Sequence, residues 1–167
     1  MSRTGTEFDD LLSANAEYAK EYLGGFDGLA HAGVCVVTCM DSRIDPLRML
    51  GLKAGDAKVL RNPGGRVTRE VMPALVVAVH LLHVRRIMVV PHTRCAMVAR
   101  SDDEIRDRIE RASGHYPGNL AFGAIEDQHE TLTADVRRVR AHPMIPAHVT
   151  VGGFVFDVDT GRLSREV

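Results

Sequence analysis

Two short stretches of this chain carry side chains whose types and spacing suit metal chemistry. In "TCMDSRID", Cys39 is followed by Asp41 and Arg43, a C-x-D-x-R pattern directly after the apolar run "VCVV". In "VVPHTRCAM", His92 and Cys95 form an H-x-x-C pattern after a second apolar run. Two thiolates and one imidazole suit Zn²⁺, and three protein ligands leave one position open, as in catalytic zinc sites. The two stretches together predict zinc bound by Cys39, His92 and Cys95.

Asp41 and Arg43 place an opposite-charge pair beside the predicted metal. Zinc lowers the pKa of bound water to about 7, so that hydroxide forms near neutral pH. Two thiolate ligands weaken this effect because they donate negative charge, so neighbouring groups must compensate. We expect Asp41 to orient the hydroxide through a hydrogen bond, and Arg43 to hold Asp41 ionised and away from the metal. The alternative is an ion pair at the surface with no catalytic role.

Other candidate groups carry less chemistry. Cys35 lies inside the apolar run and is predicted to be a core residue. Thiol redox chemistry between Cys35 and Cys39 fails on geometry, because residues four apart in a strand lie roughly 13 Å apart, too far for a disulfide. Arg61 and Asn62 end another apolar run, and we expect them to support Asp41 and its partner.

The elements that position these groups alternate between strands and helices, which is typical of a mostly parallel sheet with helices on both faces. Strands are predicted at 33–38, 57–62 and 85–91, with two more inside 148–167 joined at "DTG". Helices are predicted at 6–23, 68–84, 101–112 and 124–140, with a short one in "IDPLRMLG". Functional groups of such sheets gather beyond the carboxyl ends of the strands. If the first and third strands are neighbours, Cys39, His92 and Cys95 meet there.

Composition restricts the class of protein further. A chain of 167 residues with 45% hydrophobic and 26% charged residues predicts one globular domain over residues 1–167. The formal net charge of −1 gives no electrostatic case for nucleic acid or an anionic membrane as partner. No apolar run approaches the ~20 residues of a membrane span. The first twenty residues contain acidic residues and no apolar signal core, and three cysteines do not suggest a disulfide framework, so we expect a cytoplasmic protein.

Two of the predicted helices are more hydrophobic than a small monomer's surface allows. The helix at 68–84 is apolar almost all round, and the helix at 6–23 has an apolar face that includes Phe8, Leu11, Leu12 and Tyr22. Such surfaces are normally covered by another subunit. We therefore expect a homodimer or a multiple of it, such as a dimer of dimers.

The motifs also resemble those of a known family. "CMDSR", with "HTRC" some fifty residues later and "VLRNPGG" between them, resembles the β-class carbonic anhydrases. The closing "GFVFDVDTGRL" resembles the last strands of the short bacterial branch, which also includes carbonyl sulfide hydrolase relatives. The resemblance implies zinc ligands at Cys39, His92 and Cys95 and a catalytic dyad of Asp41 and Arg43. It also implies parallel strands in the order 2-1-3-4 with an additional edge strand, flanked by helices, and a dimer in which residues 1–24 pack on the partner subunit.

The activity implied by this resemblance is that of a zinc lyase, a carbonate dehydratase. Such an enzyme hydrates carbon dioxide reversibly to bicarbonate by zinc-bound hydroxide. Two positions depart from the family pattern, since Ala96 stands where glycine is usual and Pro63 where alanine or another small apolar residue is usual. These departures keep open a zinc hydrolase of carbonyl sulfide or carbon disulfide. The third alternative is a non-catalytic zinc-binding relative, against which the intact Asp41 and Arg43 argue.

Overall fold

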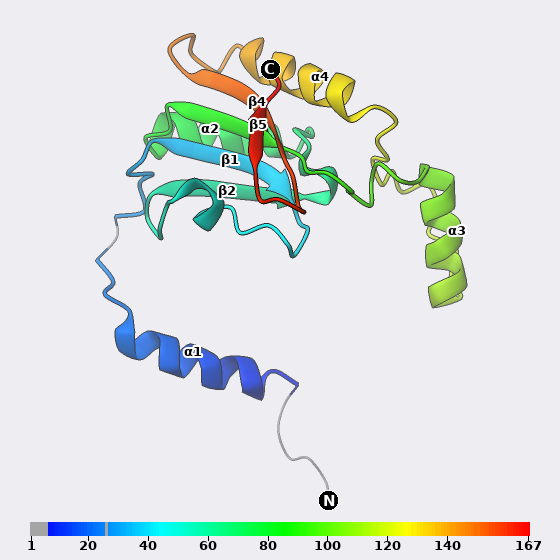
Figure 1. Ribbon diagram of the computed structural model, residues 1–167, viewed down its shortest axis with the longest axis horizontal. Helices are drawn as coiled ribbons and strands as arrows, with labels where there is room; N and C mark the ends of the chain where they lie inside the picture. The colour runs from blue at the N-terminus through cyan, green and yellow to red at the C-terminus, as the bar shows by residue number, and fades with distance from the viewer. Residues whose placement is uncertain (1–6, 26) are drawn as a thin grey trace, which may run out of the picture.

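The computed structural model describes residues 7–25 and 27–167, and its centre is a five-stranded sheet in the order β2-β1-β3-β4-β5 (Figure 1). The first four strands are parallel, and β5 pairs antiparallel with β4. The strands are β1 (Val34–Cys39), β2 (Ala57–Asn62), β3 (Arg86–Val90), β4 (Thr150–Phe156) and β5 (Leu163–Arg165). The order 2-1-3-4 with an additional edge strand is therefore confirmed.

The middle strand β1 positions the candidate site. All six of its residues are buried, as its unbroken apolar run predicts for a strand covered on both faces. In the parallel register, Cys39 pairs with Asn62 of β2, and Thr38 pairs with Val90 at the end of β3. The carboxyl ends of the three strands therefore lie at one edge of the sheet, where Cys39 ends β1 and His92 follows β3.

The helices are α1 (Asp9–Glu21), α2 (Val71–Leu81), α3 (Asp102–Ser113) and α4 (Gln128–Arg140). The helix predicted at 101–112 is α3, which starts with a capping box formed by Ser101 and Glu104. The prediction of 68–84 for α2 was too long at both ends, because the helix runs from Val71 to Leu81. At its C-terminal end, His83 has a φ of 61° and so leaves the helical region. The prediction of 124 as the start of α4 was also wrong, because the Asp127 side chain caps the helix by accepting from the Glu130 N–H at 2.8 Å.

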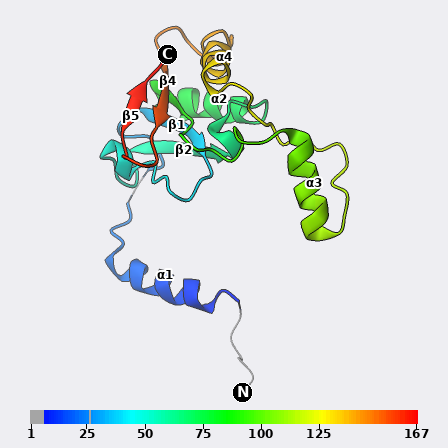
Figure 2. The same ribbon diagram turned by 45° about the vertical axis from the view of Figure 1, so that its right-hand side comes forward.

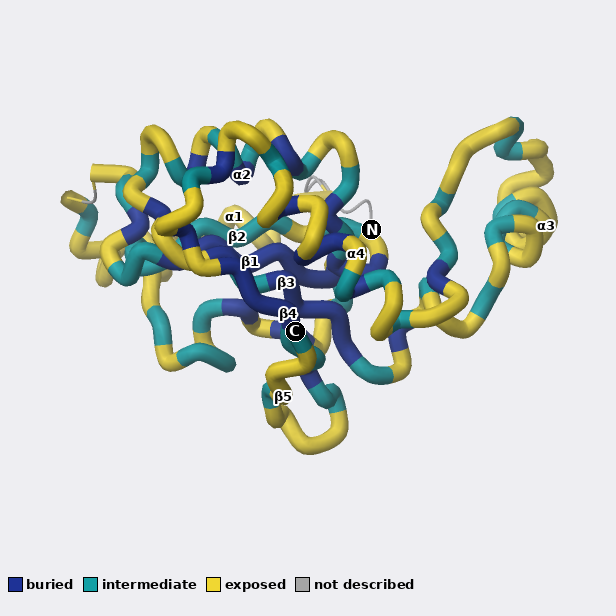
Figure 3. Tube along the Cα trace, turned by 90° about the horizontal axis from the view of Figure 1, so that it is seen from above, coloured by how far each residue is buried: buried dark blue, intermediate teal, exposed yellow. Residues whose placement is uncertain are grey.

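The two faces of the sheet are covered differently. α2 and α4 lie together on one face (Figure 3). There Leu75 and Leu132 pack with alternate strand residues such as Val37. The opposite face is covered by the β1–β2 connection, which supplies Ile44 and a short 3-10 turn, and by the region around Phe156. Helices therefore flank the sheet as expected, with the longer helices α2 and α4 on one face and the short 3-10 helix Arg48–Leu50 on the other.

Helices α1 and α3 stand away from the sheet (Figures 1 and 2). None of their residues is buried. The helix predicted at 6–23 begins at Asp9 and ends at Glu21, before the glycines at 24 and 25, because Tyr22 is already extended; Thr6 lies outside the described residues. The apolar side chains of this N-terminal segment are consequently exposed to solvent: Phe8, Leu11, Leu12, Tyr18 and Tyr22. No helix within the described ranges has the length and apolar character needed to cross a membrane.

Candidate metal centre

The structure brings the three predicted ligands together. Cys39 ends β1, while His92 and Cys95 lie in the turn that follows β3. The two sulfur atoms are 4.0 Å apart, and one donor atom from each of the three residues lies within 4.8 Å of the others. The exposed fractions of Cys39, His92 and Cys95 are 4%, 0% and 3%, so bulk solvent does not reach the ligand atoms freely. Among the described residues, these three side chains form the one group that is arranged to hold a metal ion.

The imidazole of His92 is oriented as a metal ligand would be. Its Nδ1 lies 2.9 Å from the Thr93 carbonyl oxygen, and because a carbonyl only accepts, Nδ1 carries the hydrogen and donates it. Nε2 is then left with a lone pair. Among the buried side-chain nitrogen and oxygen atoms of the described residues, Nε2 of His92 is the one that has no hydrogen-bond partner. A buried lone pair without a donor is costly, and a cation held with Cys39 and Cys95 satisfies it.

The two thiols stabilise negative charge on sulfur. Their contact lowers the pKa of Cys39, because Cys95 donates to its sulfur and the backbone N–H groups of Asp41 and Gly64 also face it. The same contact, together with burial, raises the pKa of Cys95. One thiolate is thus favoured, and a divalent cation bound here would displace the remaining proton. Two sulfurs and one neutral imidazole suit zinc, so the residues present fit this metal.

The predicted dyad stands beside the ligand atoms. Arg43 donates from Nε to Asp41 Oδ1 at 2.9 Å and from Nη2 to Oδ2 at 2.7 Å, while its backbone N–H donates to Oδ1 at 3.0 Å. These bonds hold the pKa of Asp41 well below its usual range, so the carboxyl stays ionised. Asp41 Oδ2 is 3.7 Å from His92 Nε2. A carboxylate is therefore held next to the ligand group by the arginine that follows it.

The two residues that end β2 contribute in different ways. Arg61 donates to the carbonyl oxygens of Cys39 at 2.9 Å and Asp41 at 2.6 Å, so it fixes the backbone that carries a ligand and the dyad. Asn62 bonds instead to the backbone of Arg66, through its Oδ1 and its Nδ2, each at 2.8 Å. Support for the site from Arg61 is as expected, but it acts on the backbone and not on the dyad side chains.

Other supports of the site were not predicted. Gly64 and Gly65, which follow β2, have φ angles of 79° and 67°. A Cβ on Gly65 would lie 2.9 Å from the backbone nitrogen of Cys39, so only glycine fits against this ligand. Gln128 of α4 donates to the carbonyl oxygen of His92 at 3.0 Å. The glycine pair was a signal in the sequence, but its contact with Cys39 depends on the pairing of β1 with β2.

The third cysteine plays no part in the group. Cys35 is fully buried among the apolar residues on the α2 and α4 face of the sheet. Burial raises the pKa of its thiol to about 12, so it stays protonated and inert. The prediction that Cys35 belongs to the core is confirmed.

Comparison with known proteins agrees with this geometry. Residues 34–163 match the sequence model of the family described as carbonic anhydrase. β-Carbonic anhydrase 1 of Mycobacterium tuberculosis is 36% identical over 160 residues, which covers 96% of this chain and 98% of that protein. A crystal structure of a Streptococcus mutans carbonic anhydrase is similar with a TM-score of 0.88 and 32% identity, covering 98% of this chain and 99% of that one. A carbon disulfide hydrolase of Acidithiobacillus thiooxidans is 30% identical over 148 residues, covering 77% of this chain and 74% of that protein. The chain belongs to the carbonic anhydrase family, in its β class.

Proposed function

We propose that this chain, as one zinc-dependent domain, catalyses the reversible hydration of carbon dioxide to bicarbonate at the group formed by Cys39, His92 and Cys95. The observation that carries the proposal is the buried, unpartnered Nε2 of His92 beside two cysteine sulfurs 4.0 Å apart. A purely structural zinc site has four protein ligands, whereas this group offers three and has the ionised Asp41 at its side. Membership of the β class supports the same reaction.

Each residue has a separate role in this proposal. Cys39, His92 and Cys95 hold Zn²⁺, which when bound supplies the Lewis acidity that makes water a nucleophile near neutral pH. Asp41 accepts a hydrogen bond from the reacting water, so that a lone pair of the water oxygen points toward the carbon of carbon dioxide. Arg43 keeps Asp41 ionised and prevents it from entering the ligand group. Water and carbon dioxide give bicarbonate and one proton, which leaves for the solvent.

The test combines metal analysis with a carbon dioxide hydration assay. We expect about one zinc per chain in the purified protein, and Cys95→Ser should lose both zinc and activity because it removes one of three ligands. Cys35→Ser is the matched control, since it changes a cysteine outside the group. Turnover by metal-free protein, or full zinc content and activity in Cys95→Ser, would contradict the proposal.

Hydrolysis of carbon disulfide or carbonyl sulfide is the second candidate function. The similarity to a carbon disulfide hydrolase favours it, as do Pro63 and Ala96, whose positions depart from the usual family residues. Both side chains are exposed, so they bear on access to the site and not on the ligand set. Assays of one zinc-loaded preparation with carbon dioxide, carbonyl sulfide and carbon disulfide decide between the two. Turnover of the sulfur compounds with little hydration of carbon dioxide would favour the second candidate.

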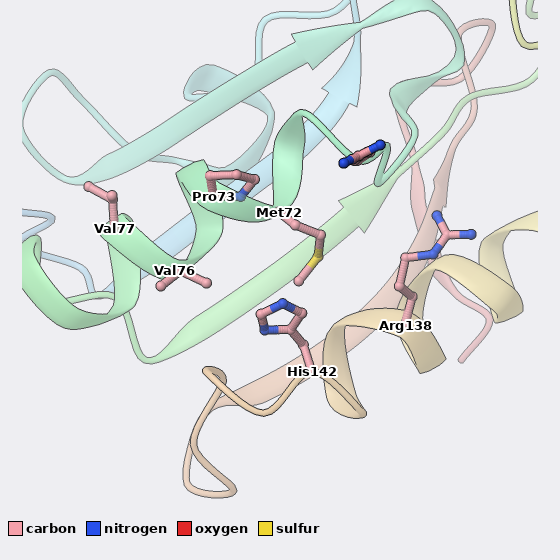
Figure 4. Close-up of a pocket in the computed structure, with 7 residues that line it drawn as sticks. Met72, Pro73, Val76, Val77, Arg138 and His142 are labelled. Carbon is pink, nitrogen blue, oxygen red and sulfur yellow. The ribbon is translucent and has the colours of Figure 1, made fainter.

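We also propose that the protein is a homodimer, or a dimer of dimers, in which α1 packs on the partner subunit. A groove of about 850 Å³ between α2 and the end of α4 offers an apolar surface for it. Figure 4 shows side chains from α2 and from the end of α4 at this groove. The groove is lined by Arg69, Met72, Pro73, Val76, Val77, Arg138 and His142. α1 has exposed apolar side chains, and its four acidic residues outnumber its one lysine. This excess of negative charge complements the two arginines of the groove.

We propose the cytoplasm as the location of the protein. Its three cysteines are all free, which suits this reducing compartment.

The oligomeric state tests the role of α1. We expect Leu12→Asp to dissociate the dimer, because it places a charge on the apolar side of the helix that the partner would bury. Ser13→Asp is the control, as an exposed polar residue at the next position of the same helix. Analytical ultracentrifugation measures both. A Leu12→Asp protein that sediments like the wild type would show that α1 does not hold the subunits together.

A further inference from the structure

A buried carboxylate lies behind the candidate metal centre. Asp135 of α4 is 1% exposed, and the described residues include two other buried polar side chains, Thr38 and His92. Asp135 Oδ2 accepts from Arg66 Nε at 2.7 Å and from the Val67 N–H at 3.0 Å. A buried charge is retained at a cost unless it is paired in this way. Since Asp135 lies outside the ligand group and the dyad, the proposed chemistry gives it no direct task.

The second arginine at Asp135 belongs to the helix that carries the carboxylate. Arg138 Nη1 donates to Asp135 Oδ1 at 3.2 Å, and Arg66 Nη2 reaches the same oxygen at 3.3 Å. Arg138 is half-exposed, whereas 24% of the Arg66 side chain is exposed. Arg66 is therefore the more buried of the two, and it is the one that comes from the turn after β2.

The turn that contains Arg66 packs directly on a zinc ligand. The Asn62 side chain closes this turn through bonds to the backbone N–H and carbonyl oxygen of Arg66. Inside the turn, Gly65 lies so near to Cys39 that a Cβ would be 2.9 Å from the Cys39 nitrogen. The Asn62 carbonyl oxygen also accepts the N–H of Met40, the residue after the ligand, at 3.1 Å. A shift of the turn must therefore move the backbone of Cys39.

We propose that Asp135 and Arg66 are positioning residues for the metal centre. Their buried ion pair anchors the turn at 62–67 to α4. Because this turn packs on Cys39, it fixes the position of the Cys39 sulfur. The inference rests on the proposed zinc function, because it assigns the pair an effect on a zinc ligand. A metal site needs its ligands held to within ~0.5 Å, so a turn without its anchor weakens zinc binding. α4 itself does not depend on the pair, since Leu132, Val136 and Val139 already pack it on the sheet.

The test compares arginine variants that lose similar contacts. Arg66→Ala removes the ion pair from the anchor of the turn, while Asp135 keeps its bonds from the Val67 N–H and from Arg138. Arg140→Ala is the matched control, because Arg140 on the same helix donates to the Val151 carbonyl oxygen at 2.6 and 3.2 Å, remote from the turn. Competition with a chelator measures zinc affinity, and the thiolate-to-metal absorption of the Co²⁺-loaded proteins reports ligand geometry.

We expect Arg66→Ala to bind zinc at least ~10-fold more weakly than the wild type, the lower end of the range for outer partners of a metal site. Its Co²⁺ absorption should also change, whereas Arg140→Ala should match the wild type in both measurements. Asp135→Asn should behave like Arg66→Ala, and if it does not fold, the folded Arg66→Ala decides the matter.

Two results overturn the inference while leaving the proposed function intact. One is a folded Arg66→Ala with wild-type zinc affinity and Co²⁺ spectrum. The other is an equal loss of affinity in Arg140→Ala, which would make the effect one of general stability. A wild-type protein that binds no zinc would instead refute the proposed function, and the inference with it.

Discussion

The Arg43→Ala variant tests the proposed mechanism most directly. Asp41 would lose the two side-chain hydrogen bonds of 2.9 and 2.7 Å and keep the backbone bond of 3.0 Å. Because Asp41 Oδ2 is already 3.7 Å from His92 Nε2, a small rotation of the released side chain brings it into the ligand group. We therefore expect the variant to keep its zinc and lose activity, since the carboxylate competes for the position that water needs.

The size of the effect follows from the bonds that are lost. The Arg43 side chain is 41% exposed, so each bond should have a strength at the lower end of the range for hydrogen bonds between charged groups. Each bond should then favour the held position of the carboxylate by roughly tenfold in the equilibrium constant. Loss of both should then reduce activity by about 10²-fold, which is also the scale for removal of a positioned catalytic group. Asp41→Ala should lose a similar factor because the water is no longer oriented. If Arg43 acts only through Asp41, the double variant should be no slower than Asp41→Ala alone.

The assay is stopped-flow hydration of carbon dioxide across neutral pH, with zinc content measured on the same samples. Wild-type activity should rise with pH as the reacting water ionises. Asp41 does not contribute to this rise, because Arg43 holds its pKa well below the usual range and it is ionised throughout. Near wild-type rates in Arg43→Ala, a double variant much slower than Asp41→Ala, or wild-type activity that falls as pH rises would each refute the reasoning.

Three further changes have defined outcomes. Cys35→Ala should keep full zinc content by elemental analysis and lower the free energy of unfolding by about 1 kcal/mol, as for a small deletion in a core; loss of zinc would contradict the assignment of Cys35 to the core. Gly65→Ala places a Cβ 2.9 Å from the Cys39 nitrogen at a φ of 67°, so urea denaturation should show a loss of about 2 kcal/mol or more, with weaker zinc binding. The Ala124 N–H, with other donors, holds the pKa of Asp102 below its ordinary 3.8, so its stabilising effect is present above pH 3.8 and is lost as pH falls through the lower folded pKa. Asp102→Asn should thus have a lower Tm at neutral pH and a shallower fall of Tm in acid, and an unchanged Tm profile would contradict this.

The grouping of the three candidate ligands could be predicted because strand ends leave a clear signal in the sequence. Cys39 directly ends an apolar run, and His92 and Cys95 follow another within five residues. Once those runs form neighbouring parallel strands, their carboxyl ends must meet at one edge of the sheet. The dyad was equally visible, since Arg43 reaches Asp41 across only two positions of the chain.

Helix ends and the covering of the sheet were predicted less well. Apolar residues continue to Val84, beyond the last residue of α2, and a hydrophobic pattern carries no information on the positive φ of His83. The alternating pattern also does not say which face each connection covers. The connection from β1 to β2 lies on the face opposite α2 and α4, and it contains only the short turn Arg48–Leu50. That face therefore carries a short 3-10 helix in place of a long one.

The supports of the site could not be predicted because they join residues far apart in the chain. Arg66 meets Asp135 across 69 positions, whereas Arg43 meets Asp41 across two. Both arginines hold a carboxylate, but the physical consequences differ. In the proposed mechanism Arg43 controls where a carboxylate stands relative to the reacting water, so its loss should lower activity while zinc stays bound. Arg66 anchors the turn behind Cys39, so its loss should weaken zinc binding, and activity at saturating zinc should fall much less than in Arg43→Ala.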